Sequence, residues 1–144
     1  LRLGESLLLG REPLHRRPMD GLHTDAITVV AEVIESGPKP SQPWGTIAQN
    51  AFGATVRPVR KGSTRQAVLA VGEQDTDCHA LVAPLGFEIT GASSDHLVLD
   101  CGSSLPPVGT EVRFGLGYSA LVRAMTSPFV AQVTNVQRGA VEAA

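Results

Sequence analysis

Gln66-Ala67-Val68-Leu69-Ala70-Val71 and the polar stretch Gly72-Glu73-Gln74-Asp75 that follows it set the pattern for the whole chain. The first stretch is short, apolar and bounded by a turn residue, which is typical of a β-strand. The second stretch is built from residues that favour turns. We therefore expect a fold made of short strands separated by polar turns.

The rest of the chain repeats this alternation, with 15 glycines and 10 prolines supplying the breaks. Further strands are predicted at residues 27–35, 87–90, 96–100, 111–115 and 129–134. A short helix is predicted at residues 119–125, because Pro128 ends a helical pattern there. Residues 11–21, 36–43 and 57–64 are expected to form loops. The predicted fold class is mainly all-β, a barrel- or sandwich-like domain with at most one or two short helices.

Composition excludes several classes of protein. The chain has 144 residues, of which 42% are hydrophobic and 18% charged, so it has the make-up of one folded domain rather than a disordered segment. Its formal net charge of −2 argues against nucleic acid as the main partner, since phosphate binding needs a basic surface. No apolar run approaches the roughly 20 residues that a membrane helix needs, so no membrane partner is expected.

Cysteine usage favours a cytoplasmic protein. Secreted disulfide scaffolds normally carry more cysteines than the two found here, Cys78 and Cys101, so we expect reduced and partly buried thiols. No Cys-x-x-Cys pair is present and the four histidines are scattered, so no metal site is predicted.

Three polar clusters interrupt the apolar runs, at residues 72–79, 91–96 and 47–53. Strand ends that carry small residues, carboxylates and amides are where functional sites tend to lie. Each cluster also has a purely structural interpretation. Asp75 could cap an ordinary turn, and Ser93-Ser94-Asp95 could form a turn closed by a hydroxyl group.

The two lysines lie in sequences that do not favour a cofactor site. Lys39 stands between two prolines, and Lys61 stands between Arg60 and Gly62. A pyridoxal phosphate (PLP) Schiff base needs a lysine held in a formed pocket. If this is a PLP protein, its cofactor lysine is expected outside the chain, and no cofactor-binding residue is predicted within it.

The order of these motifs resembles the C-terminal β-domain of the alanine racemase family, in particular its ornithine-racemase-like branch. The resemblance runs to about Thr134 and is carried by residues 66–72, by residues 91–100, by Val108-Gly109-Thr110-Glu111-Val112 and by Ala124-Met125-Thr126-Ser127-Pro128-Phe129-Val130. It implies the β-domain of a fold-type III PLP enzyme. Residues 1–10 would then be the end of a missing N-terminal barrel, residues 11–135 the β-domain and residues 136–144 a flexible tail.

One residue departs from the family pattern. Alanine racemases carry a tyrosine directly after the glycine of this turn, and here Glu73 takes that position. The resemblance therefore leaves three candidates for the second catalytic base, Glu73, Asp95 and His96. Residues expected to contact the substrate are Asn50, Asp75, Ser93 and Ser94.

The chemistry implied by the resemblance is racemisation at the Cα of an amino acid. PLP stabilises the carbanion while two bases act on opposite faces. In the family, the β-domain supplies its base to the partner subunit, which implies a head-to-tail homodimer with amino-acid substrate. Two alternatives stay open: a non-catalytic PLP- or amino-acid-binding regulatory protein, and a free-standing β-barrel that binds a ligand.

Overall fold

The computed structural model describes residues 4–41, 45, 49 and 62–134. In chain order the elements are α1 (Glu5–Leu9), β1 (Val29–Pro40), β2 (Ser63–Leu69), η1 (Cys78–Ala80), β3 (Leu81–Val82), β4 (Glu88–Ala92), β5 (Leu97–Asp100), β6 (Glu111–Leu116) and α2 (Tyr118–Thr126). The prediction of a mainly β fold with at most two short α-helices is confirmed for the described residues. The tail predicted at residues 136–144 lies outside them.

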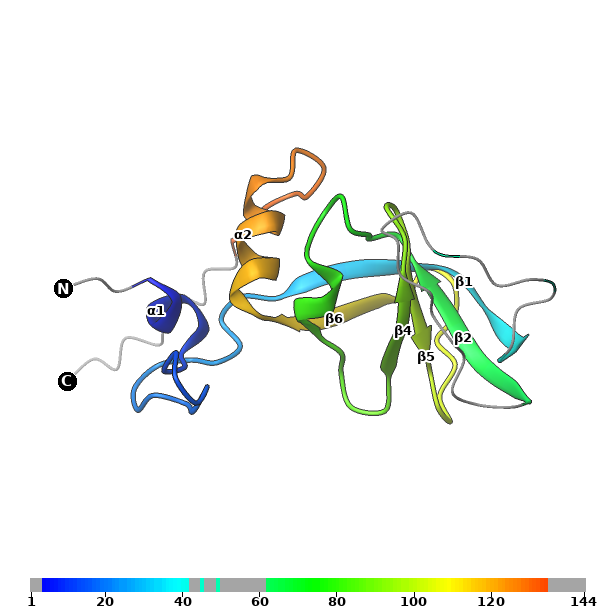
Figure 1. Ribbon diagram of the computed structural model, residues 1–144, viewed down its shortest axis with the longest axis horizontal. Helices are drawn as coiled ribbons and strands as arrows, with labels where there is room; N and C mark the ends of the chain where they lie inside the picture. Colours follow the sequence, from blue (N-terminus) through cyan, green and yellow to red (C-terminus); the bar gives the residue numbers. More distant parts are fainter. Residues whose placement is uncertain (1–3, 42–44, 46–48, 50–61, 135–144) are drawn as a thin grey trace, which may run out of the picture.

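The strands form one antiparallel sheet that curves into a half-barrel, in the order β3-β6-β1-β2-β5-β4. Strand β1 lies in the middle and is divided between two neighbours (Figure 1). Its first part pairs with β6, beginning with Val29 opposite Phe114, and its second part pairs with β2, beginning with Val33 opposite Leu69. The register shifts by one residue at Ile34, where a β-bulge bends the strand as it passes from one neighbour to the other.

The prediction that residues 36–43 form a loop is wrong for the first part of that range. Strand β1 continues through Pro38 to Pro40, with Pro38 opposite Arg65 of β2. The pairing of β1 with β6 stops at Glu32, so the proline-containing part of β1 pairs on one side only. A proline fits such a position because its missing N–H can lie on the unpaired side.

The core lies on the concave side of the sheet. In the first part of β1 the alternate residues Val29, Ala31 and Val33 are buried, as expected for a strand with one face in the core. Several side chains are completely buried, namely Val33, Leu69, Leu97, Leu99 and Phe114. Helix α2 covers part of this core with Ala120, Leu121 and Ala124, and Figure 1 shows it beside one end of the sheet.

The strand predicted at residues 129–134 is absent from the described structure. The chain is irregular there, and Phe129 and Val133 are 75% and 79% exposed. After Pro128 the backbone N–H of Phe129 bonds the Ser127 hydroxyl, which turns the chain after α2. The segment therefore pairs with no strand of the described sheet, although its apolar residues alternate. Within the described residues, no helix combines the length and apolar character needed to cross a membrane.

Candidate functional site

The fold brings two of the polar clusters identified in the sequence into direct contact. The turn at residues 72–75 follows β2, and the turn at residues 93–96 joins β4 to β5. The backbone N–H of Glu73 donates to the Ser93 carbonyl at 2.9 Å, and that of Gln74 donates to the Ser94 carbonyl at 3.0 Å. The two turns are therefore one structural unit, which we call the paired turns.

Gly72 allows the paired turns to approach this closely. A Cβ atom at this position would overlap the Ser94 carbonyl oxygen and lie 2.5 Å from the backbone nitrogen of Asp95. Real Cβ atoms do not come so close to a backbone. The glycine is required here for close approach, and its φ angle is not in the left-handed region.

Asp75 is used inside its own turn. Its Oδ2 atom accepts a hydrogen bond from the N–H of Gly72 at 3.0 Å, and its own N–H donates to the Gly72 carbonyl at 3.0 Å. The side chain is buried. Asp75 therefore caps its own turn, which is the structural interpretation of this cluster.

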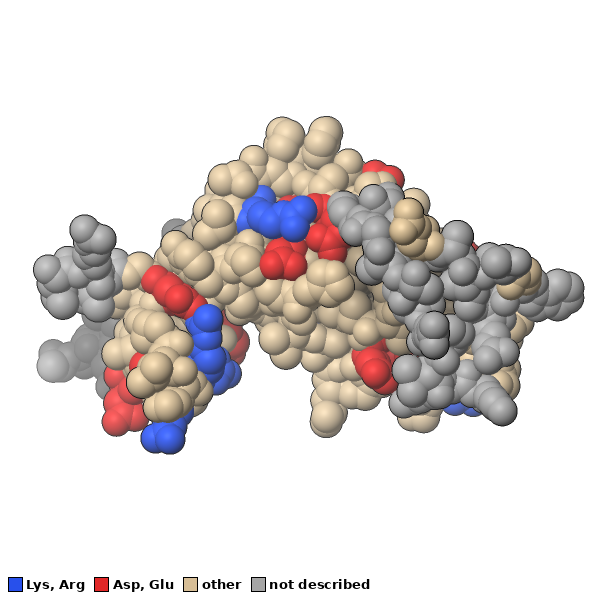
Figure 2. Space-filling view, viewed as in Figure 1, with Lys and Arg blue, Asp and Glu red and all other residues tan. Residues whose placement is uncertain are grey.

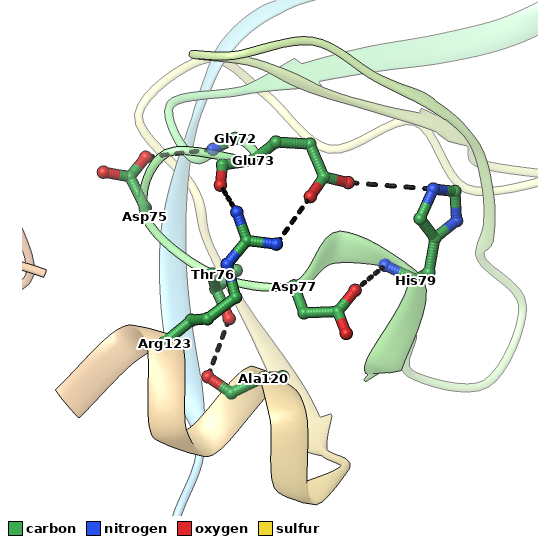
Figure 3. A network of polar contacts seen from close by, with 8 residues as sticks. All are labelled: Gly72, Glu73, Asp75, Thr76, Asp77, His79, Ala120 and Arg123. Carbon is green, nitrogen blue, oxygen red and sulfur yellow. Dashed lines mark hydrogen bonds and ion pairs between the residues drawn. The ribbon is translucent and has the colours of Figure 1, made fainter. Parts of the chain in front are cut away.

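The Glu73 side chain lies beside Arg123 of helix α2 (Figure 3). The residue is only 8% exposed. Nη2 of Arg123 donates to the Glu73 backbone carbonyl, and Nη1 lies 3.2 Å from its Oε2 atom. The other carboxylate oxygen, Oε1, is buried and accepts no hydrogen bond within the described structure, although Nε2 of the exposed His79 lies 3.8 Å away.

Helix α2 is anchored to the same segment at two further points. The buried hydroxyl of Thr76 donates to the Ala120 carbonyl at 3.0 Å, and the N–H of Gly117 donates to the Ala80 carbonyl at 2.7 Å. Arg123 was not among the site residues predicted from the sequence. The signal was present, because Arg123 is the one charged residue in the apolar helical run of residues 119–125.

The second turn leaves its polar groups at the surface. The Ser93 hydroxyl accepts from the N–H of His96 at 3.0 Å, so the turn is closed by a hydroxyl group, as its structural interpretation anticipated. Asp95 is exposed, and its Oδ1 accepts from Nε2 of Gln74 at 2.6 Å while its Oδ2 accepts from the Ser94 hydroxyl at 2.5 Å. His96 is also exposed. Of the three candidate bases, Asp95 and His96 therefore face solvent and Glu73 does not.

The surroundings of the paired turns carry an excess of negative charge. The carboxylates of Glu73, Asp75, Asp77 and Asp95 lie in or next to the turns, and Arg123 supplies the opposing charge. Figure 2 shows basic atoms over α2 bordered directly by acidic side chains. A hydrogen bond from Ser119 lowers the pKa of Asp77, which keeps that carboxylate ionised.

Both cysteines are buried and unpaired, as expected from the sequence. Cys78 follows the acidic segment directly, and burial raises the pKa of its thiol to about 12, with a further contribution from the charge of Glu73. Burial also raises the pKa of Cys101. Neither thiol is therefore a ready nucleophile, since the thiolate is the reactive form.

The described residues do not fit the main requirement of a PLP site. Nζ of Lys39 lies 2.8 Å from Oε1 of Glu35, so this lysine is held in a partly exposed ion pair on β1. Lys61 lies outside the described residues, as does Asn50, one of the predicted substrate contacts. Within the described residues, the paired turns present the acid–base groups of Asp95 and His96 at the surface.

Curated relatives match nearly the whole chain. A lysine racemase of Thermotoga maritima is 43% identical over 135 residues, which make up 92% of this chain and 38% of that protein. An ornithine racemase of Acetoanaerobium sticklandii is 40% identical over 134 residues, or 90% of this chain and 38% of that protein. No family model and no solved structure matches significantly. The chain is thus homologous to amino-acid racemases and spans 38% of the length of these relatives.

Proposed function

We propose that this chain, a homologue of part of the lysine and ornithine racemases, is the C-terminal β-domain of a PLP-dependent amino-acid racemase. The observation that carries the proposal is the meeting of the two clusters at the paired turns, where Asp95 and His96 are presented to solvent. The relatives are much longer than the region matched, which fits one domain of a larger enzyme.

In this proposal the β-domain provides the second base, and Asp95 is our first candidate. A carboxylate that faces solvent beside the turn can take a proton from a bound substrate or return one to it. Glu73 occupies the position of the family tyrosine, but its carboxylate is engaged by Arg123. His96 remains the alternative base, and it adjoins Asp95 in the same turn.

Most of the proposed substrate contacts lie in the same paired turns. Ser94 lies beside Asp95 at the tip of the turn and is positioned to meet an amino acid. Ser93 and Asp75 act from behind it, because their side chains hold the backbones of the paired turns. Asn50 keeps its assignment as a substrate contact from the sequence resemblance alone.

The substrate class we propose is an amino acid with a cationic side chain. The excess of carboxylates around the paired turns favours a positively charged ligand over a neutral one. The names of the relatives, lysine racemase and ornithine racemase, point to the same class.

The cofactor is assigned to the rest of the parent protein. PLP would supply the electron sink for the carbanion when bound there, while this chain's residues hold and move protons at the substrate. Such sharing is consistent with a head-to-tail homodimer, in which the β-domain of one subunit completes the site of the other. A cytoplasmic location is part of the proposal, and the two unpaired thiols support it.

The test uses the complete parent protein supplied with PLP in D₂O. L-ornithine, L-lysine, L-alanine and L-serine are incubated separately, and the Cα proton is followed by NMR together with the ratio of enantiomers. We expect the Cα signal to disappear and the D-form to accumulate, fastest for the two cationic amino acids. Faster reaction of alanine or serine would contradict the proposed substrate class.

A second function is favoured by one observation. Glu73 replaces the tyrosine of the family, and Arg123 and burial leave it little freedom to exchange a proton with a substrate. The parent could therefore be a regulatory protein that binds PLP or an amino acid without turnover. PLP bound to the parent with no Cα exchange for any amino acid would establish this alternative.

A further inference from the structure

We propose that Gln74 is a positioning residue that orients the Asp95 carboxylate for proton transfer at the substrate Cα. The inference rests on the proposed racemase function and adds a residue to its site. Gln74 lies between Glu73 and Asp75 in the first turn, and its side chain crosses to the second.

The geometry gives each Asp95 oxygen one donor. Nε2 of Gln74 lies 2.6 Å from Oδ1, and the Ser94 hydroxyl lies 2.5 Å from Oδ2. A carboxylate oxygen can accept more than one hydrogen bond, so both oxygens keep capacity for a substrate. Two donors from different directions define the plane of the carboxylate, and a single donor would leave it free to rotate.

The direction of the Gln74 side chain is set by its backbone. Its N–H is bonded to the Ser94 carbonyl, and the close approach at Gly72 keeps the turns in register. On one side, Glu73 turns inward to Arg123, and on the other, Asp75 turns back to cap the turn. The exposed Gln74 is the member of the turn whose side chain reaches the second turn.

Orientation matters because proton transfer depends steeply on geometry. A misplacement of about 1 Å can cost about 100-fold in rate. Asp95 is exposed, so packing does not restrain it, and hydrogen bonds are its remaining restraint. Ser94 is the adjacent residue in the same turn, whereas Gln74 ties the carboxylate to a separate segment anchored on α2.

The role can be separated from simple folding by following the two enantiomers individually. The two bases of a racemase act on opposite faces, so a misplaced β-domain base slows proton removal from one enantiomer more than from the other. The variant is Gln74→Met, which keeps the size but has no donor. Gln132→Met is the matched control, since Gln132 is exposed and lies beyond α2.

The experiment measures the initial loss of the Cα proton in D₂O from L- and D-lysine, with the full-length parent protein and PLP. For Gln74→Met we expect a fall of about 10- to 100-fold for one enantiomer and a much smaller fall for the other. The melting temperature of both variants should stay within about 4 °C of the unaltered protein, because the sites are exposed.

The outcomes test the positioning role of Gln74 separately from the proposed racemase function. Exchange in the unaltered protein with no effect of Gln74→Met, or with an equal fall for both enantiomers, would overturn the positioning role and leave the racemase function standing. Absence of exchange in the unaltered protein, with PLP bound, would overturn the proposed function and the positioning role together.

Discussion

The guanidinium of Arg123 binds both the backbone carbonyl and the carboxylate of Glu73, two groups of a residue that lies fifty positions earlier in the chain. This double contact joins helix α2 to the turn that follows β2. It explains why Glu73 is buried while Gln74 next to it is exposed. This orientation of the turn allows the Gln74 side chain to reach Asp95.

Replacing Arg123 by methionine should destabilise the fold. The change leaves the Glu73 carboxylate buried without its cation, and we expect the free energy of unfolding to fall by about 2 kcal/mol, a value reduced because Arg123 is half exposed. Urea unfolding measures the effect. Arg113→Met on β6 is the control, since Arg113 is exposed, and it should change the free energy by no more than about 0.5 kcal/mol. Equal effects of the two substitutions would show that the contact with Glu73 contributes nothing.

Gly72→Ala should separate the paired turns. The added methyl group meets backbone atoms of Ser94 and Asp95, which cannot move aside as a flexible side chain could. We expect a loss of about 3 kcal/mol or more in the free energy of unfolding. Gly37→Ala in β1 is the control, because no atom lies within 4 Å of a Cβ placed there. A Gly72→Ala protein as stable as the control would contradict the close approach.

Asp95→Ala should abolish most of the proposed activity in the parent enzyme. Loss of a general base typically costs about 100- to 10,000-fold in rate, while the absorbance of bound PLP should remain because we propose that the cofactor lysine lies outside this chain. Racemase assays and absorbance spectra measure the two properties. Asp20→Ala, at an exposed position in the loop before β1, should keep full turnover. Unchanged turnover in Asp95→Ala would remove Asp95 from the site and leave His96 as the candidate.

Cys78 should make the folded state less stable at alkaline pH. Its pKa is raised from an ordinary value of 9.0 to about 12, mainly by burial. Between these values the thiol is ionised in the unfolded chain and protonated in the folded one, so stability falls as pH rises from 9 towards 12. Unfolding measured across this window should show a shallower fall for Cys78→Ala than for the unaltered protein. Parallel curves would mean that the thiol ionises equally in both states.

Much of the sheet could be predicted because its strands follow local rules. The runs that became β2, β5 and β6 are short, apolar and bounded by turn residues, and the helical run before Pro128 became α2. Residues 36–40 escaped prediction because the prolines oppose a strand locally. Only the arrangement of neighbours, with pairing to β2 on one side, makes the strand possible.

The two polar turns of the candidate site could be predicted from the sequence, but the contact between them could not. The sequence marks residues 72–75 and 93–96 as polar turns, but their contact depends on the pairing of β2 with β5, which is a long-range property. Arg123 was missed for the same reason, since its partner lies in a distant segment. The prediction of a strand at residues 129–134 was wrong for the opposite reason, because a suitable local pattern pairs with no strand of the described sheet.

The division of β1 between two neighbours also determines how the protein can assemble as it is synthesised. The β4–β5 hairpin is local and can close early, whereas β1 must wait for β6, which emerges near the end of the described chain. Closing so long a loop carries the larger entropic cost, and pairing of this kind is slow. Until β6 arrives, the first part of β1 has an open edge beside the exposed Val30. A chain in which β6 has not yet been synthesised is therefore most prone to associate with other chains at this edge, and pairing with β6 removes that hazard.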